Sequence, residues 1–146
     1  ASVSATFGYP MITAAIAIRE ALASIKANRV ALLAPYPQHL IDAGVQYWEA
    51  SGLEVVAVQR MDLGSADTRE IYGLQSSDAL SALKSFDPGN ADAILMSGTG
   101  MPSLRALAPA AEMFGRPALS SNSCLAWALL RNLGREAQPW TAHGTF

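Results

Sequence analysis

Three short segments carry the side chains best suited to binding a small acid. They are 34–37 (APYP), 97–102 (SGTGMP) and 120–124 (SSNSC), and each follows an apolar run and leads into a helical pattern. In an open parallel sheet the loops after the strands gather at one edge, where helix N-termini present free N–H groups that favour an anion. A carboxylate is the natural ligand of such an edge. The same residues also make ordinary caps and tight turns, so both interpretations stay open.

The chain has one cysteine, Cys124, and its place at a helix start permits two interpretations. A thiolate at a helix N-terminus is an activated group. A thiol whose helical neighbours are Ala128 and Leu129, both apolar, is equally well explained as a buried structural residue. One cysteine in either case excludes an intrachain disulfide and a multi-cysteine metal site.

Metal and nucleotide chemistry are not indicated by the sequence. The two histidines, His39 and His143, have no partner at a convincing metal-ligand spacing, so we expect no metal ion. Gly98 and Gly100 form a Gly-x-Gly pair, but the third glycine of a dinucleotide motif and the lysine of a phosphate loop are both absent. We therefore expect neither a bound metal ion nor a nucleotide in the site.

The elements that must position these segments alternate between strand and helix patterns. This alternation predicts an α/β fold, a parallel sheet between two layers of helices. The predicted strands are 29–34, 53–58, 93–96 and 116–119. Helices are expected after Thr13, from Pro37, over 78–86, from Pro102, and after Asn122 or Ser123, with one short helix somewhere in 59–77. The expected inward side chains are Ala15, Ile18, Leu22 and Ile25; Leu40, Ile41, Val45 and Trp48; and Leu104, Leu107, Ala108 and Ala111.

Composition excludes several classes of partner. Lys and Arg total 10 against 12 for Asp and Glu, so the chain lacks the basic surface that nucleic acid or an anionic membrane requires. The longest apolar run, 9–18, is about half the length of a membrane span and ends at Arg19 and Glu20. The lone cysteine and the lack of a secretory pattern favour the cytoplasm.

Length and hydrophobicity bear on domain organisation. The 146 residues suit one domain, which we place at 1–134, followed by an irregular tail at 135–146. Hydrophobic residues make up 51% and charged residues 15%, which indicates a surface covered by a partner. Because the chain starts at Ala1 without an initiator Met, we expect it to begin within a longer protein.

Four segments resemble the arylmalonate decarboxylase and maleate isomerase branch of the aspartate/glutamate racemase superfamily. They are 8–13 (GYPMIT), 30–36 (VALLAPY), 93–104 (AILMSGTGMPSL) and 114–131 (FGRPALSSNSCLAWALLR). The resemblance implies a fold of two similar lobes with the active site between them, of which this chain is the second. The first lobe, roughly a hundred residues, would come from a companion chain or segment.

The resemblance also places Gly98 where the second-lobe cysteine of the family stands. Racemases of the superfamily use one cysteine from each lobe as acid and base, and the decarboxylases use a single cysteine in this lobe. Without a thiol at Gly98, two-thiol racemisation is not available to this chain. Any thiol chemistry must come from the missing lobe or from Cys124.

The activity that the resemblance implies is that of a cofactor-independent lyase or isomerase acting on a small carboxylic acid. Tyr36 would hydrogen-bond a substrate oxygen, while the N–H groups at Gly98, Thr99 and Gly100, with the Thr99 hydroxyl, would form an oxyanion hole. Met101 would form part of the apolar side of the substrate site. The expected substrate-binding residues are Pro35, Ser97, Gly100, Met101, Ser121 and Asn122.

Two other hypotheses of function remain open. Loss of the cysteine at Gly98 is also compatible with a carboxylate-binding or structural lobe that has no catalytic activity. Hydrolysis by a hydroxyl such as Thr99 or one of the Ser120–Ser121 pair is a third hypothesis, although no histidine or acid is recognisable in the sequence as its activating partner.

Overall fold

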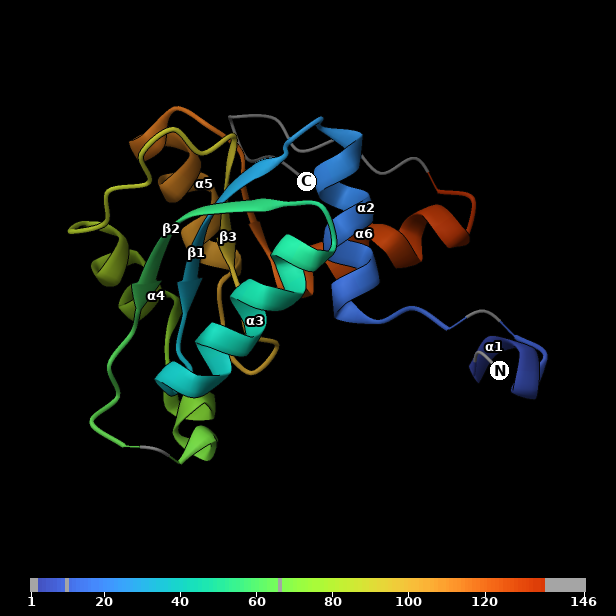
Figure 1. The fold of residues 1–146 in the computed structure, drawn as a ribbon, viewed down its shortest axis with the longest axis horizontal. Helices are drawn as coiled ribbons and strands as arrows, with labels where there is room; N and C mark the ends of the chain where they lie inside the picture. The colour runs from blue at the N-terminus through green and yellow to red at the C-terminus, as the bar shows by residue number, and fades with distance from the viewer. Residues whose placement is uncertain (1–2, 10, 66, 136–146) are drawn as a thin grey trace.

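A parallel sheet of four strands forms the centre of the structure (Figure 1). The computed structural model describes residues 3–9, 11–65 and 67–135. The strands are β1 (Arg29–Ala34), β2 (Glu54–Arg60), β3 (Ala93–Met96) and β4 (Ala118–Ser120), in the spatial order β2-β1-β3-β4. Every neighbouring pair is parallel, so the carboxyl ends of all four strands lie at one edge.

Helices cover both faces of the sheet, which confirms the predicted three-layer α/β fold. They are α1 (Val3–Phe7), α2 (Ala14–Ser24), α3 (Gln38–Ala50), α4 (Ser76–Leu83), α5 (Leu104–Phe114) and α6 (Ser121–Asn132), with a 3-10 helix η1 (Thr68–Gly73). One core cluster joins α2, α3 and α6 to the sheet, and a second joins η1, α4 and α5 to its other face. The sheet thus separates two apolar cores.

The central strands β1 and β3 were predicted with the right boundaries because they are apolar on both faces. Val30 and Leu32 of β1 belong to the first cluster, whereas Ala31 and Leu33 belong to the second. This alternation is the period-two geometry of a strand buried on both sides. Pairing of β1 with both β2 and β3 fixes it as an interior strand.

Capping explains where the helices begin and end. The Thr13 hydroxyl accepts a hydrogen bond from the N–H of Ile16 at 3.2 Å, so the predicted N-cap of α2 is confirmed. Gly115 ends α5 in the left-handed conformation, with φ 61°, as expected of a C-cap glycine. At α6, however, the N-cap is Ser120, and Ser123 is its capping-box partner. The prediction of Asn122 or Ser123 as the cap was therefore wrong by two or three residues.

The predicted buried face of α5 was right for Leu107 and Ala111, which are buried, and wrong for Leu104 and Ala108. Leu104 is 63% exposed and Ala108 is exposed, whereas Ala106 and Ala110 are fully buried. Alanines occur all round this helix, so its apolar stripe does not define a unique face, and packing against the sheet selects one. Leu40 of α3 is likewise exposed, although it was expected to face inward.

The structure describes the first helix but almost none of the predicted C-terminal tail. Helix α1 has no buried residues and lies apart from the sheet in Figure 1. The predicted tail, 135–146, lies outside the described residues except for Arg135. Within the described ranges no helix is long and apolar enough to span a membrane.

Asp92 ties together the amino ends of the two central strands. Its carboxylate accepts hydrogen bonds from the N–H groups of Asn28 and Arg29 at 3.0 and 2.8 Å and from the Arg29 guanidinium at 2.7 Å. The Asp92 N–H in turn donates to the Arg29 carbonyl oxygen at 2.7 Å. The Arg29 hydrogen bonds hold the pKa of Asp92 well below its usual range.

Replacement of Asp92 by Asn should destabilise the fold by about 1 kcal/mol at pH 7, because the charged acceptor of these bonds is lost. Since the folded-state pKa is lowered, the stabilisation is fully present above the ordinary value of 3.8 and is lost progressively as the pH falls from there through the lowered folded-state pKa. Urea unfolding of the wild type and Asp92→Asn at pH 7 and pH 3 measures this. An equal difference at both pH values would contradict the assigned role.

Candidate functional site

The loops after β1 and β3 meet at the carboxyl edge of the sheet. The Ser97 N–H donates to the Leu33 carbonyl oxygen at 2.8 Å, which brings 97–101 beside Pro35 and Tyr36. Gly98 is buried and has φ 142°, a conformation that L residues rarely adopt. A Cβ placed on Gly98 would lie 3.3 Å from ring carbons of Pro35 and 3.5 Å from the Tyr36 hydroxyl oxygen. The structure therefore puts the Tyr36 hydroxyl directly against the Gly98 position.

The start of α6 holds this loop in place. The Gly98 N–H donates to the buried Ser121 hydroxyl at 3.1 Å, and the Asn122 side-chain amide donates to the Thr99 carbonyl oxygen at 3.0 Å. Both side chains were expected to bind substrate, and in the structure both bind the loop.

The Gly98 N–H is consequently not available to an oxyanion, which corrects that part of the expected hole. Within 97–101, the N–H groups of Thr99 and Gly100 have no protein acceptor among the described residues. Thr99 is exposed and Ser97 is half-buried. The donors left at this edge thus include the N–H groups of Thr99 and Gly100 and the hydroxyls of Thr99, Tyr36 and Ser97.

Tyr36 is suited to donating a hydrogen bond. Its side chain is half-buried and packs against both core clusters. Burial raises the pKa of the Tyr36 hydroxyl above its ordinary value, and the nearby Tyr72 adds to the shift. The hydroxyl is therefore neutral at pH 7 and keeps its proton for a bound oxygen.

Tyr72 belongs to the same edge and was missed in the sequence. A Cβ on Gly100 would lie 3.1 Å from Cε1 of Tyr72 and 3.3 Å from Cγ2 of Ile71, so η1 packs directly on the loop. The Tyr72 side chain is 77% exposed. Mixed signals over 59–77 gave no means of placing this residue, and an exposed aromatic beside a glycine-rich loop is visible only after folding.

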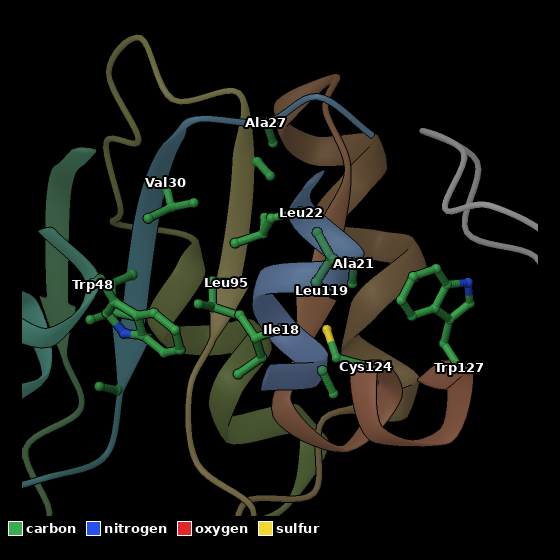
Figure 2. Packing of buried hydrophobic residues seen from close by; sticks show 14 of the residues in the cluster. Ile18, Ala21, Leu22, Ala27, Val30, Trp48, Leu95, Leu119, Cys124 and Trp127 are labelled. Atoms are coloured by element: carbon green, nitrogen blue, oxygen red, sulfur yellow. The ribbon is translucent and has the colours of Figure 1, made fainter. Parts of the chain in front are cut away.

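Two predicted residues lie in the core instead of at an open site. Met101 is fully buried in the cluster of α4 and α5, so it supports the loop from below. Cys124 is fully buried beside Ile18 and Ala21 of α2, with its sulfur inside the cluster drawn in Figure 2. Burial raises the pKa of the Cys124 thiol to about 12. Its surroundings favour the structural interpretation over an activated thiolate.

Hydrolytic and metal chemistry find little support at this edge. Within the described part of the chain, no hydrogen bond joins the hydroxyl of Thr99 or Ser121 to a histidine or a carboxylate. Across the same ranges no group of three or more His, Cys, Asp or Glu side chains is arranged to hold a metal ion. The arrangement can bind and polarise a carboxylate through neutral donors.

A protein-family model described as arylmalonate decarboxylase matches residues 1–146. Among curated proteins, the maleate isomerase of Geobacillus stearothermophilus is 31% identical over 125 residues, which are 85% of this chain and 49% of that protein. The maleate isomerase of Nocardia farcinica is 33% identical over 118 residues, or 80% and 46% of the two chains. This chain thus spans about half the length of these relatives.

Solved structures agree with these matches. A maleate isomerase of Pseudomonas putida S16 with maleate superposes with a TM-score of 0.83 at 25% identity, covering 94% of this chain and 54% of that one. A mutant Nocardia farcinica maleate cis-trans isomerase with a covalently bound succinylcysteine intermediate gives 0.80 at 31% identity, covering 90% and 54%. Arylmalonate decarboxylase gives 0.81 at 20% identity over 97% and 62%, a likeness of fold alone.

Replacing Ser121 by Ala should release the Gly98 N–H and leave it buried without an acceptor. We expect a loss of about 1–3 kcal/mol in unfolding free energy, together with faster hydrogen exchange at the Gly98 amide. Urea unfolding and NMR-detected exchange measure the two effects. The matched control is Ser51→Ala, which removes a hydroxyl bonded to the Tyr47 carbonyl on the exposed end of α3. Slow exchange at Gly98 in Ser121→Ala would contradict this role.

Proposed function

Because this chain belongs to the arylmalonate decarboxylase family, we propose that it is the second lobe of a cofactor-independent isomerase or lyase acting on a small carboxylic acid. Tyr36 and Thr99 are its proposed catalytic residues, with Gly98 at the position of the family cysteine. The remaining proposed substrate contacts come from Pro35, Ser97 and Gly100. The first lobe is proposed to come from a companion chain or segment.

The observation that carries the proposal is the distance of 3.5 Å between the Tyr36 hydroxyl oxygen and the Cβ position at Gly98. A reacting carbon at the place of the family thiol would have its carboxylate within reach of Tyr36. The N–H groups of Thr99 and Gly100 lie on the same loop and add donors to the oxygens. Such donors are worth about 3 kcal/mol each when they face an oxygen on which charge develops.

Maleate is the substrate that the relatives suggest, since four curated maleate isomerases match the chain. In the proposed reaction a thiolate from the first lobe adds to one alkene carbon of maleate. The electron pair of the double bond then moves onto the carboxylate as an enediolate, which the donors near Tyr36 stabilise. Rotation about the resulting single bond and departure of the thiolate give the trans isomer.

A second candidate is a lobe that binds a carboxylate without catalysis. The φ of 142° at Gly98 favours it, because a cysteine would be strained there and the loop would have to move to accept one. A protein with this backbone supplies no second-lobe thiol to a substrate. Turnover by the complete two-lobe assembly distinguishes the two candidates, since both predict binding.

Exposed apolar side chains support the companion lobe. Phe7 of α1 and the adjoining Tyr9 are 60% and 58% exposed, and Met11 is 44% exposed. Phe7 and Tyr9 contact one another at 6.1 Å between ring centroids. A cluster of exposed aromatic side chains on a helix apart from the sheet is typical of a surface that another chain or lobe covers.

Replacement of Tyr36 by Phe should weaken maleate binding, and should lower turnover tenfold or more once the first lobe is supplied, because one donor to the enediolate is lost. Isothermal titration with maleate and an assay of the trans product measure the two effects. The control is Tyr47→Phe, on the exposed side of α3. Unchanged binding and turnover in Tyr36→Phe would remove Tyr36 from the site.

Native mass spectrometry of the purified protein should find a companion bound to this chain. We expect a partner of roughly a hundred residues, held through the α1 segment. Phe7→Ser combined with Tyr9→Ser should release it, while Tyr47→Ser, on another exposed surface, should not. A monomer that turns over maleate without any companion would contradict the shared site.

A further inference from the structure

A groove of about 930 Å³ lies where the N-termini of α4, α5 and α6 come together. Tyr36 is not among the residues that line it, so the groove is next to the Tyr36 edge and not part of it. Its polar side includes Ser103 and Arg105 at the start of α5, and its apolar side includes Leu80 and Ala126. Asn122 is the residue that connects the two regions, because it lines the groove and holds the Thr99 carbonyl oxygen.

The N-terminus of α5 is left uncapped inside this groove. Helix α4 has a capping box of Gln75 and Asp78, and α6 has one of Ser120 and Ser123. At α5 the N-cap residue Ser103 makes no capping hydrogen bond. The N–H groups that follow it, of Leu104 and Arg105, have no acceptor among the described residues. Such N–H groups attract an anion.

The Ser103 hydroxyl is a second and independent sign of a ligand. Ser103 is only 3% exposed, and its hydroxyl has no hydrogen-bond partner in the described ranges. A buried hydroxyl without a partner is costly, and native structures rarely contain one. Because Ser103 lines the groove, an anion bound at the start of α5 would satisfy it.

Charge in the groove favours the same class of ligand. Arg105 lines it and forms no ion pair within the described part of the chain. No Asp or Glu lines the groove. The acid at the start of α4, Asp78, accepts a hydrogen bond from the Gln75 N–H at 2.7 Å. Arg105 is thus a cation without a protein partner beside three helix N-termini.

We propose that this groove binds an organic carboxylate, distinct from the acid proposed to bind near Tyr36. The carboxylate accepts from the Ser103 hydroxyl, the N–H groups at the start of α5 and the Arg105 guanidinium. The hydrocarbon part of the ligand packs on Leu80, Leu104 and Ala126, because the groove is far larger than a bare ion needs. A ligand in the groove contacts Asn122, whose side-chain amide holds the Thr99 carbonyl oxygen.

The test is an NMR titration of the 146-residue protein with hexanoate, using hexanamide as the neutral counterpart and acetate as the ligand without an apolar body. We expect shifts at the amides of Leu104 and Arg105, and about tenfold weaker binding of hexanamide and of acetate. Arg105→Gln and Ser103→Ala should each weaken hexanoate about fivefold to tenfold. Arg19→Gln, which removes an arginine from the outer side of α2, should change the affinity less than twofold.

Three outcomes would overturn the proposal. The first is equal binding of hexanoate and hexanamide, and the second is equal affinity in Arg105→Gln and Arg19→Gln. The third is a set of shifts confined to Thr99 and Gly100 that Tyr36→Phe abolishes, because it would assign the ligand to the site proposed above. If Ser103→Ala does not fold, Arg105→Gln decides the question. The Arg105 side chain is exposed, so its replacement should leave the fold intact.

Discussion

The hydrogen bond from the Gly98 N–H to the buried Ser121 hydroxyl is the interaction on which this edge of the sheet depends. It joins the loop after β3 to the first turn of α6 across 23 residues of sequence. With the chain held there, Gly98 takes a φ open to glycine, and Pro35 and Tyr36 close over the place where a side chain would stand. The tie between Asn122 and Thr99 then fixes the outer half of the loop.

This constraint decides which groups the carboxyl edge of the sheet presents. A loop fixed by α6 presents N–H groups and hydroxyls at constant positions, and such preorganised neutral donors stabilise an oxyanion without supplying a proton carrier. Tyr36, whose pKa is raised by burial, stays protonated and belongs to the same set. The one thiol of the chain, Cys124, is held in the core between α2 and α6. Under the proposed function, this chain would therefore contribute binding and charge stabilisation.

Much of this architecture was predictable from the sequence, because strands buried on both faces leave an unmistakable pattern. β1 and β3 were placed to the residue, and parallel strands brought the three polar segments to one edge. The missed features depend on contacts between distant residues. Alanines on every side of α5 hide its buried face, the Ser120 cap depends on its bonds with Ser123, and Tyr72 reaches Gly100 only through the fold. The contact of the Ser121 hydroxyl with the Gly98 N–H was likewise not foreseen, because it joins residues 23 apart in the sequence.

Exposure at this edge bears on the proposed companion lobe. Thr99 is exposed, and Tyr72 is 77% exposed. A hydrogen bond made in water contributes little net free energy, because the ligand exchanges solvent donors for protein donors. The same donors become effective once water is excluded and the local dielectric constant falls. A lobe that covers Thr99 and Tyr72 would therefore strengthen the hydrogen bonds that the donors at this edge make to a ligand, without moving any donor. The strength of each donor thus depends on the lobe that would exclude water from it.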